Sequence, residues 1–246
     1  GMNDPWAPSC ASPTTLAVAQ IGERGAATYS FYIEGTSTGN LSSGQALAVL
    51  AANPTVLYVG SFGLVLGPGA SAYEALIGAV GPDVLLAVDP NCRPAVVRDP
   101  VDFRARIARV LTRADIVKVS TEDLDYLTPG VDHVTAAQQL RDLGPSIVLV
   151  TDGGHAVTVI AEHWRRIVPV PNVTVVDTGV AGDSFFGAVL AHWDASGWGR
   201  AQLSDSRAMV SAVEFGVAIS GITCGRTGAD PPRIAELTPA LQAKVS

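Results

Sequence analysis

The sequence predicts an α/β fold in which helices cover both faces of a mostly parallel sheet. Beyond residue 43, short apolar runs alternate with longer helix-like segments, which is the order expected of strands joined by crossover helices. The runs are apolar at nearly every position, as in parallel strands buried on both faces. A chain of 246 residues is long enough for one large domain, or for one domain with a small appendage.

Each element follows from its own pattern. Expected helices span 44–52, 70–80, 102–112, about 135–143, 182–195 and 206–223, and expected strands span 56–59, 84–88, 115–119, 147–151, 156–161, 164–169 and 173–176. Ahead of them, two β-branched and aromatic runs at 15–20 and 27–34 flank the turn-forming residues 22–25, which indicates an antiparallel hairpin. Residues 1–13 are rich in proline, so we expect an irregular start.

Charge and cysteine content exclude several classes of protein. A formal net charge of −7 and a pI near 5.0 argue against nucleic acid as a partner and favour small molecules. The three cysteines are far apart and form no CxxC pair, so we expect neither a zinc site nor disulfides, and a cytoplasmic location. No continuous apolar run reaches the roughly 18 residues of a membrane helix, so no membrane partner is expected.

A loop of small residues ends in Asp183, at the start of the helix expected from residue 182. A helix N-terminus offers free backbone N–H groups and the positive end of the helix dipole, which together bind anions. An aspartate there can accept the proton of a substrate hydroxyl. The alternative is that Asp183 only caps the helix. The sequence contains no GxxxxGK[ST] motif and no GxGxxG motif at a strand–helix junction, so neither of those phosphate-binding loops is expected.

The segment 177–188, DTGVAGDSFFGA, resembles the second signature of the ribokinase or PfkB family of carbohydrate kinases, D-T-x-G-A-G-D. Four further blocks resemble family motifs in the same order: 89–94, 115–120, 148–154 and 224–232. The resemblance implies a ribokinase-like three-layer α/β/α sandwich with a mostly parallel sheet. It also implies two parts, a partial β lid hairpin at 14–40 and a nucleotide- and substrate-binding domain at 41–246.

The resemblance implies an ATP-dependent sugar kinase with Asp183 as the catalytic base. The remaining implied roles are an anion hole at Val180, Ala181 and Gly182; nucleotide binding by Lys118, Ser120, Thr151, Gly153 and Thr178; contacts with substrate or phosphate from Arg93 and Tyr32; and an indirect role for Asp123 near the metal. The implied cofactors are ATP and Mg²⁺, and a monovalent cation such as K⁺ is a further expectation.

Within the family, the hairpin and the G-S-x-G-x-x-L pattern from Gly60 resemble those of bacterial fructokinases. Fructose, a ketose, is therefore the leading substrate. A kinase for 2-keto-3-deoxygluconate or for a nucleoside remains an alternative. Lid hairpins in this family often pair between subunits, so a homodimer through the lid is also an expectation.

Three departures from the family pattern bear on activity. Val180 stands where the family has glycine. A β-branched residue there would be strained if the position needed a positive φ, or would block access if the backbone had to approach phosphate closely. Ser120 and Asp123 replace the asparagine and glutamate of N-x-x-E. The family's opening G-G-x-x-x-N segment is not found ahead of the hairpin, so we expect either an omitted segment or a naturally short relative. A catalytically impaired relative that binds nucleotide or sugar therefore remains open.

Overall fold

A computed structural model describes residues 6–21 and 27–245, and its centre is a six-stranded sheet. The strands lie in the order β3-β4-β5-β6-β7-β8. The pairs from β3 to β6 are parallel, and β7 and β8 continue the sheet as antiparallel strands. Their bounds are β3 Val56–Gly60, β4 Leu85–Asp89, β5 Ile116–Ser120, β6 Ile147–Thr151, β7 Ala156–Ala161 and β8 Arg165–Pro169.

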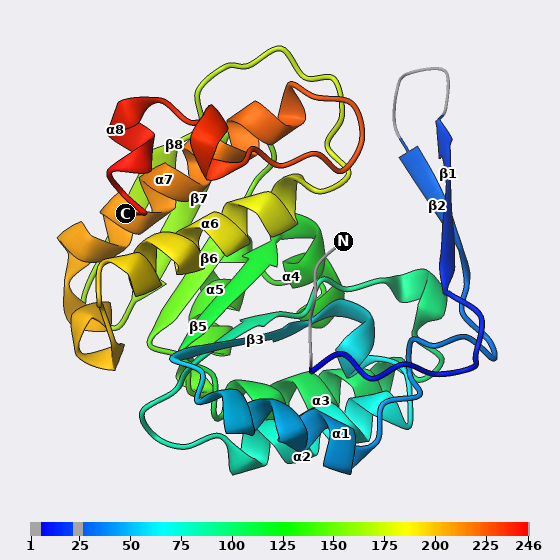
Figure 1. The fold of residues 1–246 in the computed structure, drawn as a ribbon. Coiled ribbons are helices and arrows are strands. Elements are labelled where there is room, and N and C mark those ends of the chain that lie inside the picture. Colours follow the sequence, from blue (N-terminus) through cyan, green and yellow to red (C-terminus); the bar gives the residue numbers. More distant parts are fainter. Residues whose placement is uncertain (1–5, 22–26, 246) are drawn as a thin grey trace.

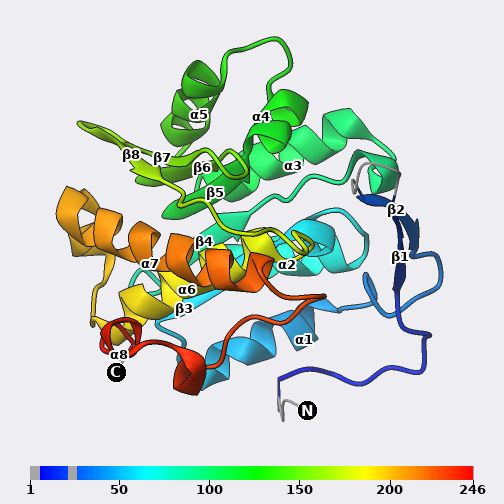
Figure 2. The ribbon, with the colours of Figure 1, turned by 90° about the horizontal axis from the view of Figure 1, so that it is seen from above.

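Helices form layers on both sides of this sheet (Figures 1 and 2). The helices are α1 Ser43–Ala48, α2 Gly69–Ala79, α3 Pro100–Leu111, α4 Thr121–Leu127, α5 His133–Asp142, α6 Ala181–Ala195, α7 Ser206–Cys224 and α8 Pro239–Gln242. One face of the sheet is covered by α3, α4 and α5, and the other face by α6 and α7. The expected three-layer sandwich is therefore confirmed.

The two faces follow from the alternation of side chains along each strand. In β4, Leu86 and Val88 enter the core under α3, whereas Leu85 and Ala87 pack against the α6 layer. Strands β5 and β6 divide their side chains in the same way. Since both faces are buried, the central strands are apolar at nearly every position, and this pattern is what made them recognisable in the sequence.

The hairpin is a separate two-stranded sheet, formed by β1 Leu16–Ile21 and β2 Ala27–Tyr32 in antiparallel pairing. It stands away from the main body at the right of Figure 1. The Phe31 ring meets the Phe62 ring edge-on at 5.2 Å, and Arg98 forms an ion pair with Glu34. These contacts attach the base of the hairpin to the sandwich. The predicted turn at residues 22–25 lies outside the described residues.

Two sequence predictions differ from the structure. Residues 173–176 do not form a strand, because the backbone N–H groups of Val176 and Asp177 donate to the Cys224 carbonyl rather than to a neighbouring strand. Helix α4 was not predicted. It begins directly after β5 because Ser120 and Asp123 form a capping box, in which each side chain accepts a hydrogen bond from the other residue's backbone N–H.

Helix α7 is, by length and composition, apolar enough to cross a membrane. Half of that stretch is buried inside the structure, and its contacts with α6 are the most extensive between any two helices described. A long apolar helix of this kind is what the core of an α/β sandwich requires.

The close packing of α6 and α7 depends on Gly216. A Cβ atom at this position would lie 2.6 Å from Val189 Cγ2 and 2.8 Å from the Phe185 carbonyl oxygen. Both distances are too short for non-bonded atoms, and one involves backbone, which cannot move aside without displacing α6.

We therefore expect Gly216→Ala to lower the free energy of unfolding by about 1–3 kcal/mol, the usual cost of overpacking a core. Gly187→Ala is the matched control in the partner helix, because a Cβ at Gly187 has no other atom within 4 Å. Alanine is the better helix former, so this control should gain up to about 1 kcal/mol. Urea denaturation measures both, and equal stabilities for the two variants would contradict the prediction.

Candidate active site

The first turn of α6 lies above the carboxyl ends of the central strands. Three polar residues stand on the face of the sheet that α6 covers: Asp89 at the end of β4, Lys118 in β5 and Thr151 at the end of β6. In each strand the residue two positions earlier, Ala87, Ile116 or Leu149, packs in the core beneath α6. The alternation that builds the core thus also brings these polar groups together.

Asp183 is the third residue of α6, and its side chain is exposed. The N-cap is Val180, and no side chain caps the helix by a hydrogen bond. Among the described residues, none donates a hydrogen bond to the Asp183 carboxylate. Asp183 therefore makes no capping hydrogen bond, and it lies in the first turn, where an acidic side chain also favours the helix dipole.

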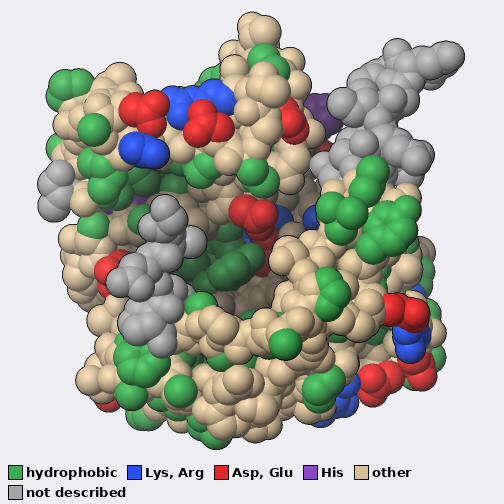
Figure 3. All heavy atoms as spheres, turned by 45° about the vertical axis from the view of Figure 1, so that its right-hand side comes forward, with side chains coloured by type: hydrophobic (Ala, Val, Ile, Leu, Met, Phe, Trp, Pro, Cys, Tyr) green, Lys and Arg blue, Asp and Glu red, His purple; other side chains and the backbone are tan. Residues whose placement is uncertain are grey.

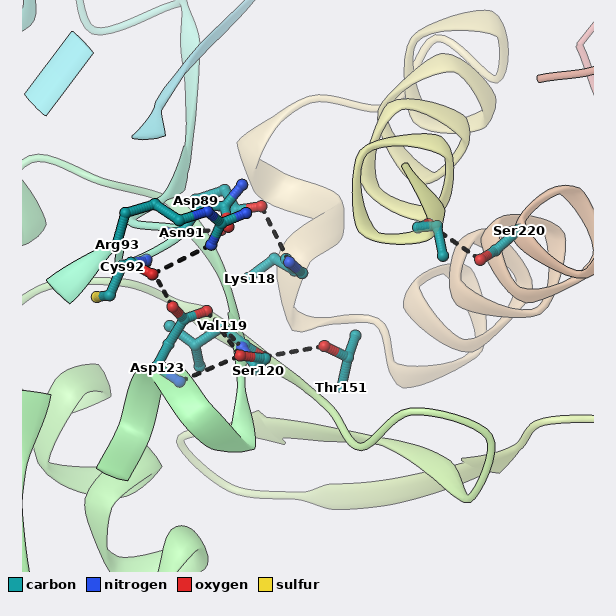
Figure 4. A network of polar contacts seen from close by, with 11 residues as sticks. Asp89, Asn91, Cys92, Arg93, Lys118, Val119, Ser120, Asp123, Thr151 and Ser220 are labelled. Atoms are coloured by element: carbon teal, nitrogen blue, oxygen red, sulfur yellow. Dashed lines mark hydrogen bonds and ion pairs between the residues drawn. The ribbon is translucent and has the colours of Figure 1, made fainter. Parts of the chain in front are cut away.

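Val180 has a negative φ. Its φ is −125° and its ψ is 19°, outside the left-handed region that favours glycine. The concern that valine here would have to take a positive φ is therefore wrong for this structure. Ala181 donates its N–H to the Thr178 carbonyl, and Ser220 of α7 donates its hydroxyl to the Ala181 carbonyl at 3.0 Å, so the loop and the first turn are held from both sides (Figure 4).

Lys118 and Asp89 form a buried ion pair beneath this turn. Lys118 Nζ lies 3.0 Å from Asp89 Oδ2, and the two side chains are 6% and 0% exposed (Figure 4). Burial raises the pKa of Asp89 to about 6, although Lys118 acts to lower it, and the charges of Asp123 and Asp183 raise it further. Burial, together with Asp89 and Asp183, also raises the pKa of Tyr58. These groups therefore share one electrostatic environment.

Gly182 allows the helix to sit directly on this pair. A Cβ atom built on Gly182 would lie 3.1 Å from Lys118 Nζ. A side chain at this position would crowd the ammonium group, so glycine favours the close approach.

Asp123 is tied into a second network, on the other side of β5. Its Oδ2 accepts from the Ser120 N–H at 2.8 Å and from the Ser120 hydroxyl at 3.0 Å, and its Oδ1 accepts from the Cys92 N–H at 2.6 Å (Figure 4). Both carboxylate oxygens of this buried side chain thus have protein donors. Asp123 joins the turn after β4 to the start of α4, and any effect on a metal would act through that turn.

A cavity of about 410 Å³ opens between the strand ends and α6. All five residues predicted to bind nucleotide line it, as do two of the three predicted anion-hole residues: Lys118, Ser120, Thr151, Gly153, Thr178, Ala181 and Gly182. Its far wall is apolar and includes Val157, Val170, Pro171, Phe185 and Val217. Figure 3 shows one face of the molecule, which is hollowed near its centre and has apolar, acidic and basic side chains in the hollow.

The first turn of α6 separates this cavity from a second, more apolar one. Val180 and Asp183 line that second cavity, of about 540 Å³, together with residues of α7 and of the segment 229–237. One helical turn therefore presents its glycine side to the first cavity and its carboxylate to the second. A chemical group transferred from the first cavity to the second would pass the N-terminus of α6.

Arg93 and Tyr32 are not brought to Asp183 by hydrogen bonds in the described structure. Arg93 donates from Nη1 to the Cys92 carbonyl at 3.1 Å, and Tyr32, at the end of β2, is 61% exposed. Their predicted contacts with substrate or phosphate stay predictions.

The closing block of the sequence supports the loop before α6. The Asp177 carboxylate accepts from the Gly179 N–H at 2.8 Å and from the Gly228 N–H at 3.0 Å. These two hydrogen bonds hold the pKa of Asp177 below its usual value. Residues about fifty positions apart are thus joined by hydrogen bonds to one side chain in the loop before α6.

The sequence reasoning missed three contributors to the site. Asp89 was recognised within a motif but given no role, although it is the partner of Lys118. Glu122, exposed and lining the first cavity, follows Ser120 by two positions and could have been noticed there. The apolar wall from β7 and the segment 170–175 carries no motif, so only the folded structure reveals it.

The described residues include no group of three or more His, Cys, Asp and Glu side chains close enough to hold a metal ion. Mg²⁺ bound to ATP does not need one, because it keeps several waters and takes the phosphates with one or two carboxylates as ligands. Glu122 presents a carboxylate at this cavity, with a long hydrogen bond of 3.4 Å from the Thr121 hydroxyl, so the residues present fit a metal that arrives with the nucleotide.

The sequence profile of the pfkB family of carbohydrate kinases matches residues 11–235. The chain therefore belongs to the pfkB family of carbohydrate kinases. A fructokinase of Rhizobium leguminosarum bv. trifolii is 35% identical over 179 residues, which cover 73% of this chain and 54% of that protein. The chain thus spans about half the length of this relative.

Solved structures show the same fold. The fructokinase of Xylella fastidiosa with bound ATP superposes with a TM-score of 0.78 at 24% identity, covering 90% of this chain and 70% of that one. A double mutant of the Vibrio cholerae fructokinase, with fructose, ADP and a potassium ion bound, also gives 0.78 at 23% identity, covering 97% and 74%. The fold is therefore the ribokinase-like fold of sugar kinases.

The raised pKa of Asp89 predicts how the free energy of unfolding changes with pH. Asp89 ionises near pH 3.8 when unfolded and near pH 6 when folded, so the folded state retains a proton that the unfolded state loses between these values. The contribution of Asp89 to stability should therefore fall as pH rises from about 4 to 6, by about 3 kcal/mol in all at about 1.4 kcal/mol per pH unit.

The measurement is urea denaturation of the wild type and of Asp89→Asn at several values between pH 4 and pH 7. Titrations shared by both proteins cancel in the difference. A difference that stays constant over this range would show that Asp89 is not shifted in the predicted direction.

Proposed function

We propose that this protein is an ATP-dependent sugar kinase that transfers the terminal phosphoryl group of ATP to a hydroxyl of fructose. One observation carries the proposal. Asp183 lies in the first turn of a fifteen-residue helix, and its exposed carboxylate accepts no hydrogen bond from the described residues. The same turn borders a cavity lined by the residues expected to bind nucleotide. Base and anion-binding backbone thus lie within a single turn, as phosphoryl transfer requires.

Each part of the site has a separate task in this reaction. The apolar wall of the first cavity suits the adenine ring, and its polar end suits the phosphates. The N–H groups at the start of α6, with the Lys118 ammonium beneath them, would stabilise charge on the phosphoryl group in transfer. Asp183, on the other side of the turn, would accept the proton of the attacking hydroxyl.

The cofactors and location belong to the same proposal. Mg²⁺ would screen the phosphate charges, with Glu122 as the carboxylate within reach of the cavity. Use of a monovalent cation such as K⁺ is supported by the potassium-bound Vibrio cholerae structure, and fructose as the substrate by the fructokinases that this chain resembles. The cytoplasm, where ATP is available, is the proposed location.

The hairpin is proposed as a lid and as a site of pairing between two subunits. Leu16 lies opposite Tyr32 across the hairpin, and Val18 follows on the same face. All three are exposed, Leu16 by 56% and Tyr32 by 61%, so an apolar surface is left uncovered on one face of the hairpin. Pairing with the same face of a second copy would bury it. Residues 14–40 would then form the lid, and 41–246 the nucleotide- and substrate-binding domain.

Asp183→Asn tests the proposed base. We expect kcat for fructose to fall by about 10²–10⁴-fold, the usual contribution of a general base, while ATP binding is kept because the backbone of α6 is unchanged. ADP release measured by a coupled assay gives kcat, and calorimetry gives ATP affinity. Asp194→Asn, near the other end of α6, is the control and should retain activity. Turnover that survives in Asp183→Asn would rule out this role.

Val180→Gly tests whether the Val180 side chain limits kcat. Because Val180 has a negative φ, we expect glycine to change kcat by no more than about three-fold. The same coupled assay measures the change. A much larger gain would show that the valine side chain obstructs transfer, and would favour the alternative of a catalytically impaired relative.

A further inference from the structure

A contribution to stability does not by itself explain why Lys118 and Asp89 form a buried ion pair. Removing two charges from water is costly, and a buried ion pair can often be replaced by apolar residues without loss of stability. Lys118 also lies next to Gly182, at the positive end of the α6 dipole. A buried ammonium group is disfavoured at such a place unless a nearby anion balances it.

Asp89 is that anion, and it is held in one orientation. Its Oδ2 accepts from Lys118, while its Oδ1 accepts at 3.0 Å from the N–H of Asn91, which has a φ of 41°. Both oxygens are therefore engaged, and the carboxylate cannot rotate without losing a bond. As the side chain at the end of β4, it is completely buried.

The neighbouring carboxylates are engaged elsewhere or lie further away, so Asp89 is the fixed partner of Lys118. The other ionisable groups that interact with Asp89 are Asp183 from α6, Asp123 from α4, Tyr58 from β3 and Cys92 from the turn after β4. Asp123 is engaged by Ser120 and Cys92, and Asp183 is exposed on the far side of the first turn. Lys118 lines the first cavity, so its ammonium group has Asp89 on one side and the nucleotide cavity on the other.

We propose that Asp89 is a positioning residue of the transfer reaction, which acts by holding the Lys118 ammonium group against the first turn of α6, where it faces the phosphates. This inference rests on the proposed kinase function. Asp89 itself touches neither nucleotide nor sugar. Its carboxylate keeps a cation charged and in place at an anion site, so that the positive charge need not be reorganised during transfer.

A double-mutant cycle tests this inference with Asp89→Asn, Lys118→Met and the two combined. The measured quantities are kcat and KM for fructose, and the affinities for AMP and for a non-hydrolysable ATP analogue. We expect each single variant to lower kcat by about 10-fold or more, with a much smaller change in KM for fructose. The preference for the ATP analogue over AMP should fall by a similar factor, because AMP lacks the outer phosphates.

The activity of the combined variant decides the test. If Asp89 acts only through Lys118, the combined variant should be no less active than Lys118→Met alone. Effects that multiply would overturn the inference, since Asp89 would then act independently. Should Asp89→Asn fail to fold, the comparison of Lys118→Met with the combined variant still decides, because the combined variant leaves no charge unpaired.

Asp115→Asn is the matched control for a purely structural effect. Asp115 is also buried at a strand of the same sheet and also ion-paired, with Arg113 and Arg200, but at the opposite ends of the strands. It should lose stability and keep both kcat and the preference for the ATP analogue. If Asp89→Asn behaves as Asp115→Asn does, the inference is wrong.

The two proposals fail in different ways. A wild-type protein that releases no ADP with fructose would contradict the proposed function alone. The binding arm of the cycle would then still decide the role of Asp89, because the preference for the ATP analogue over AMP needs no turnover.

Discussion

The packing of α6 against the sheet fixes the rest of the site. Phe185, Phe186, Val189 and Trp193 of this helix are all buried in the core above β4 to β7. Aromatic side chains of this size bury a large apolar area, so the helix cannot slide or rotate without exposing it. Because Phe185 and Phe186 follow Asp183 closely, the anchored part of the helix begins just after Asp183. The position of Asp183 is therefore set by the hydrophobic core.

Charge then determines what this fixed end of the helix can bind. The carboxylates of Asp123 and Asp183 lie close enough to Asp89 for their charges to raise its pKa. They are opposed by Lys118 and by the positive end of α6. A ligand that brings phosphates together with a divalent cation adds charges of both signs and suits such a mixed environment. The arrangement is consistent with the binding of a metal–nucleotide complex.

Much of the fold and part of the site could be predicted because local patterns carry them. The parallel strands are apolar runs, and the hairpin is a pair of β-branched runs around a turn. The residues expected at the nucleotide all line one cavity, since motifs that follow successive parallel strands meet at the same edge of the sheet. The expected strand at 173–176 failed because apolar composition does not reveal whether a neighbouring strand is present to pair with it.

By itself, the sequence determined the class of fold, the place of Asp183 at a helix start and the membership of a kinase family. Only the tertiary structure decided which groups act on one another. Asp89 and Lys118 are 29 residues apart, and nothing local in the sequence indicates that they pair. The negative φ of Val180 was likewise visible only in the folded chain. The physical reason is that pairing and backbone conformation depend on contacts between distant segments, which local patterns do not encode.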